Sequence, residues 1–130
     1  MVFTPSSAGG LVQVNVKGIG EAIDAIRKKG KDILTQKDAK TLQAANMLQQ
    51  EIQESIIGNR GEEPSVLTGN FANSITIDKI KDLVYKVYTN VEYAQFLEYG
   101  TVYMTPRSHF RNSLARNRQK IIDIIKSKSI

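Results

Sequence analysis

Hydrophobic residues follow two different spacings in the first half of the chain, one typical of a strand and one typical of a helix. From Leu11 to Val16 apolar and polar residues alternate, and most of the apolar ones are β-branched, which predicts a strand. After Gly18 the apolar residues recur at three- and four-residue intervals, which predicts a helix over about residues 19–32. A second helix is predicted over about 36–57, with an apolar face made of Leu42, Ala45, Leu48, Ile52 and Ile56. A break at 30–35 separates the two helices in this prediction, although residues 31–34 could equally continue the helix.

The second half of the chain carries a strand pair between helical segments. Residues 74–80 and 83–89 are rich in β-branched and aromatic side chains and flank a short polar pair, which predicts an antiparallel hairpin. Thr68 is placed to cap a helical turn before the hairpin. A short helix is predicted over 92–99 and an amphipathic C-terminal helix over about 109–126. The pattern therefore predicts an α+β fold, with a small antiparallel sheet of the N-terminal strand and the hairpin packed against the helices.

The stretch from residue 93 to residue 101 has the sequence YAQFLEYGT and is the most aromatic part of the chain. Tyr93, Phe96, Leu97 and Gly100 follow one another at the spacing of one helical face. Gly100 is expected to end this helix, because glycine adopts the left-handed conformation without steric cost. So aromatic a segment is expected to pack against other elements.

Glu98 is the unusual member of this stretch. A carboxylate in the last turn of a helix faces the negative end of the helix dipole, which costs roughly 0.3–1 kcal/mol. Glu98 therefore either is solvated or has a partner, and the nearest cations in the sequence are Arg107 and Arg111.

Length and composition indicate one domain. The 130 residues are 41% hydrophobic and 24% charged, which is typical of a soluble globular protein. Residues 1–10 have few apolar anchors and predict a flexible arm before a single domain over 11–130. The chain has no cysteine, no apolar run near the ~20 residues of a membrane helix and no signal-peptide pattern, so we expect it to be made in the cytoplasm.

Positive charge is concentrated at the C-terminal end. Seven basic residues follow residue 106, against the single acid Asp123, whereas the rest of the chain is close to neutral. Such a segment could meet DNA phosphates or an acidic protein surface, although a solvated helix face is the commoner explanation.

The sequence predicts no catalytic or metal site and no cofactor. The single histidine, His109, and the absence of cysteine exclude a Cys–His nucleophile or a His-rich zinc site. His109 lies beside Phe110 at a predicted helix start, where a structural or interfacial role is expected. The paired acids Glu62 and Glu63 lie in a predicted polar loop over 58–64, where solvation is expected.

Three segments in order, PSVLTGNFANSI, YAQFLEYGT and MTPRSHFRNSL, resemble a family of head–tail joining proteins of long-tailed phages. The family comprises small neck or tail-completion proteins, also called minor tail components, and is typified by the tenth gene product of the lambdoid phage Hong Kong ninety-seven. The resemblance spans about residues 12–125. The positions that match its motifs are Thr68, Gly69, Ser74, Ile75, Tyr93, Ala94, Leu97, Glu98, Gly100, Thr101, Pro106, Phe110 and Ala115. Two departures are Phe71 in place of the usual leucine and Ser108-His109 in place of the usual proline before Phe110, which puts the rigidity of that loop in question.

The resemblance implies a non-enzymatic virion structural protein, assembled in the host cytoplasm, that forms a ring around the DNA channel between head and tail. Its implied partners are other copies of itself, the head connector or stopper, and the tail terminator or tail tube proteins. A closed ring needs two different contact faces on each subunit, and the arm 1–10 and the loop 58–64 are expected to order on assembly. Alternative roles are a tail terminator ring or a small sequence-nonspecific DNA-binding protein.

The resemblance also sharpens two residue-level predictions. A family motif that keeps an acid at a helix end implies a fixed partner for Glu98: a backbone amide, Arg107 or Arg111. In a ring subunit the basic C-terminal helix is expected to turn Arg111, Arg116, Arg118 and Lys120 toward a protein neighbour or weakly toward DNA.

Overall fold

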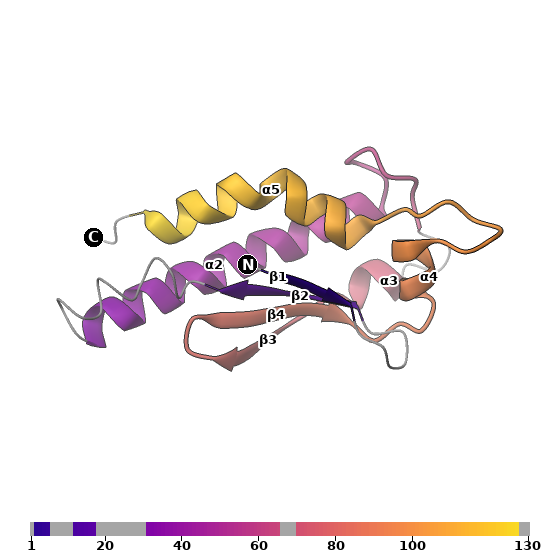
Figure 1. Ribbon diagram of the computed structural model, residues 1–130. Helices are drawn as coiled ribbons and strands as arrows, with labels where there is room; N and C mark the ends of the chain where they lie inside the picture. Colours follow the sequence, from indigo (N-terminus) through magenta and orange to yellow (C-terminus); the bar gives the residue numbers. More distant parts are fainter. Residues whose placement is uncertain (1, 6–11, 18–30, 66–69, 128–130) are drawn as a thin grey trace.

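The computed structural model describes residues 2–5, 12–17, 31–65 and 70–127 (Figure 1). Along the chain the elements are β1 (Val2–Pro5), β2 (Val12–Lys17), α2 (Lys31–Ile56), α3 (Asn70–Asn73), β3 (Thr76–Lys81), β4 (Val84–Thr89), α4 (Ala94–Tyr99) and α5 (His109–Lys126). The predicted α+β fold is confirmed. The hairpin and the two last helices lie where the sequence predicted them, with shifts of at most two residues at their ends.

The sheet is antiparallel, with the strand order β1-β2-β4-β3. The N-terminal strand β2 therefore pairs with the second strand of the hairpin, with Val14 opposite Val87. Strand β1 was not part of the prediction, which gave residues 1–10 as an arm without regular structure; residues 6–10 of that arm lie outside the described residues. Strand β3 forms one edge of the sheet, and most of its residues are exposed.

Helices α2 and α5 cover one face of the sheet and run antiparallel (Figure 1). Lys37 at the start of α2 donates from Nζ to the carbonyl oxygen of Ile125 at the end of α5 (2.9 Å), while Ser55 at the end of α2 contacts His109 at the start of α5. The core between these layers holds the inward-facing valines of β2 and β4 and the apolar stripes of both helices: Val12, Val14, Val16, Val87, Leu48, Ile52, Ile56, Phe110, Ile121 and Ile125. The alternation in β2 is the direct cause of this arrangement, because every second side chain of a strand faces the same side.

The N-terminal half differs from the prediction in its helices. Helix α2 is 26 residues long and begins at Lys31, so residues 31–35 are helical and the expected break does not occur there. The predicted helix over 19–32 lies almost wholly outside the described residues. Leu42, placed on the buried face of this helix, is 38% exposed, whereas Thr41 and Ala44 are buried.

Candidate functional site

The N-terminus of α5 is capped by a side chain from another helix. The first backbone N–H groups of a helix have no partner within it, and the preceding residue Ser108 (φ 43°) makes no side-chain cap. Glu98 of α4 fills this role: Oε1 accepts from the backbone N of Phe110 and Oε2 from that of Arg111, both at 2.9 Å. The Arg111 guanidinium also donates to Oε2, from Nε at 3.2 Å. One carboxylate therefore joins α4 to α5.

The burial of Glu98 explains why it needs several donors. The residue is 1% exposed, and burial raises the pKa of its carboxyl, an effect that the Arg111 and Phe110 amides and the Arg111 guanidinium oppose. Its unfavourable position at the end of α4 is offset by the positive end of the α5 dipole. The predicted partnership with a backbone amide and Arg111 is confirmed. Arg107 instead donates to the carbonyl oxygen of Pro64 and to Ser65.

The segment that links α4 to α5 is fixed at both ends. Gly100 has φ 77° and ψ 177°, and a Cβ here would lie 2.8 Å from the carbonyl oxygen of Met104 and from Pro106. The positive φ was predicted, but ψ is extended rather than helical. The carbonyl oxygen of Leu97 accepts from the backbone N of Arg107 (2.7 Å) and of Ser108 (3.2 Å).

Ser108 and His109, which replace the usual proline of the family motif, do not loosen this link. Ser108 donates from Oγ to the carbonyl oxygen of Glu98 at 2.8 Å, and its Oγ accepts from Arg111. His109 is fully buried. The two residues thus bind the start of α5 to α4 and to the core.

Helix α4 buries a different face from the one predicted. Its most buried residues are Ala94 and Glu98, each 1% exposed, whereas Tyr93, Phe96 and Tyr99 are 44%, 49% and 38% exposed. The aromatic side chains are therefore only a little more than half buried, so the expectation that they pack against other elements holds in part. The polar Glu98 takes the inward position because α5 supplies the donors for it.

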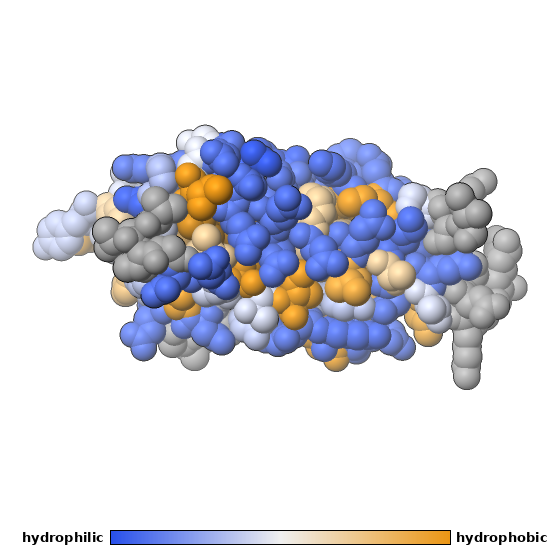
Figure 2. Space-filling model, turned by 180° about the vertical axis from the view of Figure 1, so that it is seen from behind, coloured by the Kyte–Doolittle hydropathy of each residue, from blue (hydrophilic) through white to orange (hydrophobic). Residues whose placement is uncertain are grey.

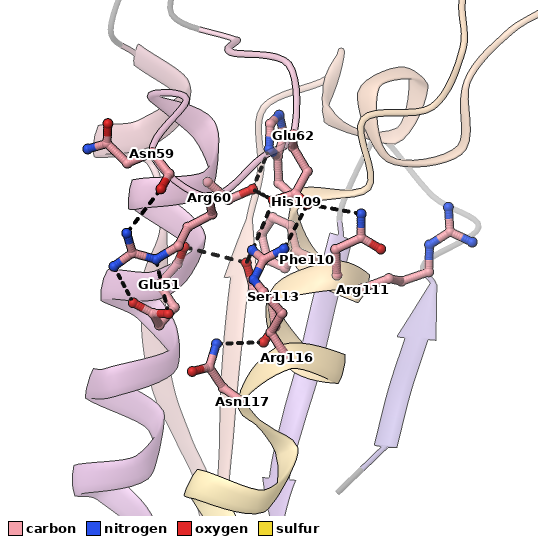
Figure 3. Close-up of polar contacts among 12 residues, drawn as sticks. Glu51, Asn59, Arg60, Glu62, His109, Phe110, Arg111, Ser113, Arg116 and Asn117 are labelled. Atoms are coloured by element: carbon pink, nitrogen blue, oxygen red, sulfur yellow. Dashed lines mark hydrogen bonds and ion pairs between the residues drawn. The ribbon is translucent and has the colours of Figure 1, made fainter.

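The loop over 58–65 is bound to α5 by Glu62 (Figure 3). Arg116 donates to both carboxylate oxygens, at 2.7 and 2.9 Å, and Ser55 and Asn112 donate to the same group. Burial alone would raise the pKa of Glu62, but the hydrogen bonds from Arg116, Ser55 and Asn112 lower it to about 2. Glu62 is thus not solvated as expected, although Glu63 is 76% exposed. The loop has partners inside the subunit that the sequence did not indicate.

His109 lies at the centre of a hydrogen-bond chain that joins this loop, α2 and α5. Its Nδ1 lies 2.8 Å from Oγ of Ser55, and its Nε2 lies 2.9 Å from Oγ of Ser65. Since Ser55 gives its single hydrogen to Glu62, Nδ1 must carry the imidazole proton, and Nε2 then accepts from Ser65. Burial lowers the pKa of His109 to about 4, so the neutral ring that this chain requires is the stable form. The structural role expected for His109 fits this position.

The four basic residues predicted to face a partner divide into two pairs. Arg111 and Arg116 make the intramolecular ion pairs with Glu98 and Glu62, and Arg111 also lies 4.6 Å from the ring centroid of Tyr99. Arg118 and Lys120 are exposed on α5. What these four side chains meet in a virion stays a prediction.

The remaining motif positions serve mainly to build the fold. Ser74 hydrogen-bonds through Oγ to Thr89 and to the carbonyl oxygen of Phe71, and Ile75 and Phe110 are buried. Phe71, which replaces the usual leucine, is 2% exposed. Pro106 and Ala115 are exposed, and Thr101 pairs with Met104 in a tight turn. Thr68 and Gly69 lie outside the described residues.

The described side chains include no cluster of three or more metal-ligating residues. Within the same part of the chain, no helix is long and apolar enough to cross a membrane. In this region two carboxylates and one histidine hold α4 and the 58–65 loop on α5.

Comparison with known proteins gives one family. A family model described as "Bacteriophage HK97-gp10, putative tail-component" matches residues 20–100, which is more than half of the chain. The match includes the YAQFLEYG segment and ends before the 101–104 turn and α5. No curated protein and no solved structure matches the chain.

Proposed function

The chain belongs to the HK97-gp10-like family of phage tail components, and from this premise we propose that it is a structural protein of the head–tail connection. In this role it forms a ring around the DNA channel in the neck and joins the head connector to the tail. The proposal assigns it no catalytic activity and no cofactor. Its partners are other copies of itself and the head and tail proteins on either side.

The observation that carries the proposal is the family match across α2, the hairpin and α4. The structure supports the proposal through the contacts of two motif residues and through the exposure of the aromatic side chains. Glu98 joins α4 to α5 through its hydrogen bonds, Gly100 packs closely against Met104 and Pro106, and the aromatic side chains of α4 are left partly exposed. A helix anchored in this way, with exposed aromatic residues, suits a protein that binds other proteins.

A DNA-binding role for the free subunit is the weaker alternative. Two of the arginines that favoured it are occupied by Glu98 and Glu62, which leaves Arg118 and Lys120 as exposed cations of the predicted set. A gel-shift titration at low and moderate salt tests it, because phosphate binding through a few cations weakens steeply with salt. Micromolar binding at low salt would favour this alternative.

A gene disruption in the phage that encodes the chain tests the main proposal. We expect DNA-filled heads and separate tails to accumulate, and purified protein to restore joined particles when it is added to the lysate. A tail terminator would instead give tails of abnormal length, and normal infectious particles without the protein would refute the proposal. Electron microscopy of the lysate distinguishes these outcomes.

A further inference from the structure

A chain of buried polar groups holds the 58–65 loop at its base. The loop projects above the start of α5 in Figure 1, and Figure 3 shows Glu62 and His109 beside Arg116 at this point. The face of the molecule in Figure 2 is mostly hydrophilic, with hydrophobic side chains in small separate groups, so it has no broad apolar docking surface. The base of the loop is more unusual, because its hydrogen bonds depend on a histidine that is fully buried.

The hydrogen bonds at this base require a neutral His109. Its Nδ1 donates to Oγ of Ser55, and Oγ of Ser65 donates to its Nε2. The Ser55 hydroxyl donates in turn to Glu62, and Oγ of Ser65 also accepts from Nη1 of Arg107 at 3.0 Å. A proton added at Nε2 removes the acceptor of the Ser65 hydroxyl. If that hydroxyl turns to accept from Nε2, its own hydrogen loses its acceptor.

The surroundings of His109 also oppose a positive charge on the ring. The groups that face it are Glu62 of the loop, Arg107 of the α4–α5 link, Arg116 of α5, the uncharged Ser55 of α2 and the edge of the Phe71 ring of α3. The two guanidinium groups disfavour a cation, and Glu62 already binds Arg116 through both carboxylate oxygens. A protonated ring therefore needs water, and Ser65 occupies the hydrogen-bonding position at Nε2.

Ser65 joins the loop to two helices at once. Its side chain binds His109 at the start of α5, and its backbone N donates to the carbonyl oxygen of Ile56 at the end of α2 at 2.8 Å. Movement of Ser65 away from His109 therefore also breaks this backbone hydrogen bond. The exchange of the Ser65 amide hydrogen with solvent reports that movement.

We propose that residues 62–65 form an acid-released latch. Uptake of one proton from solvent at Nε2 of His109 frees Ser65 and Glu62 from α5, and the loop opens while the sheet and the helices stay folded. In the open form the guanidinium groups of Arg107 and Arg116 lose their partners in the loop. This inference concerns the free subunit and does not depend on the proposed ring.

The pKa of His109 sets the size of the effect. Burial lowers this pKa to about 4 in the closed form, whereas its ordinary value is 6.5, so the open form binds the proton first and acid favours opening. The ratio of open to closed loops should rise roughly 20-fold from pH 7 to pH 5. Burial raises the pKa of Glu62 and its hydrogen bonds lower it, to about 2, and its ordinary value is 4.5. Protonation of Glu62 therefore contributes little above pH 5.

Nuclear magnetic resonance tests the latch on the unaltered protein. His109 is the only histidine, so its ring nitrogen signals are unambiguous, and they should show the Nδ1–H tautomer at pH 7. The protection factor of the Ser65 amide hydrogen should fall roughly 20-fold from pH 7 to pH 5. At pH 5 it should also lie at least about tenfold below that of Val87 in the central strand β4, because the loop opens without the sheet.

Two variants separate His109 from other acid-sensitive groups. His109→Gln keeps a donor and an acceptor but cannot titrate, so the 20-fold change in Ser65 protection should disappear. Glu63→Gln is the matched control, since Glu63 is a 76% exposed acid of the same loop, and it should retain the full change.

Three results would overturn the latch. They are an Nε2–H tautomer at pH 7, equal protection of Ser65 and Val87 at both pH values, and a fall in Ser65 protection that persists in His109→Gln. Equal protection would mean that the loop opens only when the whole domain unfolds. The tautomer and the comparison with Val87 need no substitution, so they decide the question even if His109→Gln does not fold.

Discussion

Replacing Glu98 by alanine removes the group that joins α4 to α5. The carboxylate accepts three hydrogen bonds, two from backbone N–H groups in the first turn of α5 and one from the Arg111 guanidinium. All three donors lose their partner in Glu98→Ala, and the 1% exposure of the site leaves little room for water to replace it. We expect the free energy of unfolding to fall by about 2–4 kcal/mol, because two backbone N–H groups are left without an acceptor at about 1–3 kcal/mol each, whereas Arg111, whose side chain is 40% exposed, can turn to water.

Glu98→Gln separates the hydrogen bonds from the charge. The amide keeps one carbonyl acceptor for a backbone N–H, but its NH₂ group faces the remaining donors. Because burial raises the pKa of Glu98, the charge itself is partly unfavourable in the fold. The glutamine variant should therefore lose less than the alanine variant, about 1–3 kcal/mol.

Urea denaturation followed by circular dichroism measures both variants. The alanine loss corresponds to a decrease of roughly 10 °C or more in melting temperature for a domain of this size. Glu92→Gln is the control, since Glu92 is an exposed acid just before the same helix, and it should stay within about 0.5 kcal/mol of wild type. A loss below about 1 kcal/mol for Glu98→Ala would refute the capping role of Glu98.

Three further changes test the other joints. Arg116→Ala should lower the free energy of unfolding by about 1–2 kcal/mol, because the side chain of its partner Glu62 is only 9% exposed. Arg118→Ala should change this free energy by less than about 0.5 kcal/mol. Equal losses in the two variants would contradict the ion pair between Arg116 and Glu62. Gly100→Ala should cost roughly 2–3 kcal/mol, and Gly61→Ala, where φ is also positive but no atom lies within 4 Å of the new Cβ, should cost less. His109 is neutral in the fold with a pKa of about 4 and is protonated near pH 6.5 when unfolded, so acid favours the unfolded chain. Stability should fall by roughly 2 kcal/mol from pH 7 to pH 5, and His109→Gln, which removes the only histidine, should abolish that part of the slope. An unchanged slope in this variant would contradict the assignment of a neutral histidine.

Helices and strands could be predicted wherever hydrophobic residues kept one regular spacing without interruption. The alternation in β2 and the helical spacing in α5 each imply a buried face, and both elements lie where they were predicted. The break expected at 30–35 does not occur within residues 31–35, because the polar residues there are weak local signals. A helix packed along a sheet and a second helix can continue through such residues.

The joints at the functional site were only partly predictable. The unfavourable position of the Glu98 carboxylate at a helix end indicated that it needed a partner, and this partner is the first turn of α5. Nothing local indicated Glu62 and Arg116, which are 54 residues apart, or the contacts of His109 with Ser55 and Ser65. Such pairs depend on which loops the fold brings together. The most buried face of α4 was mispredicted for the same reason, since hydrophobicity alone cannot say which face of α4 meets α5.

The position of the chain in the virion is the central claim, and a cryo-electron microscopy reconstruction of the phage neck tests it most directly. The account predicts a closed ring of this subunit around the DNA channel at the head–tail joint. A joint built entirely from other proteins, with this chain elsewhere in the particle or absent from it, would contradict the account.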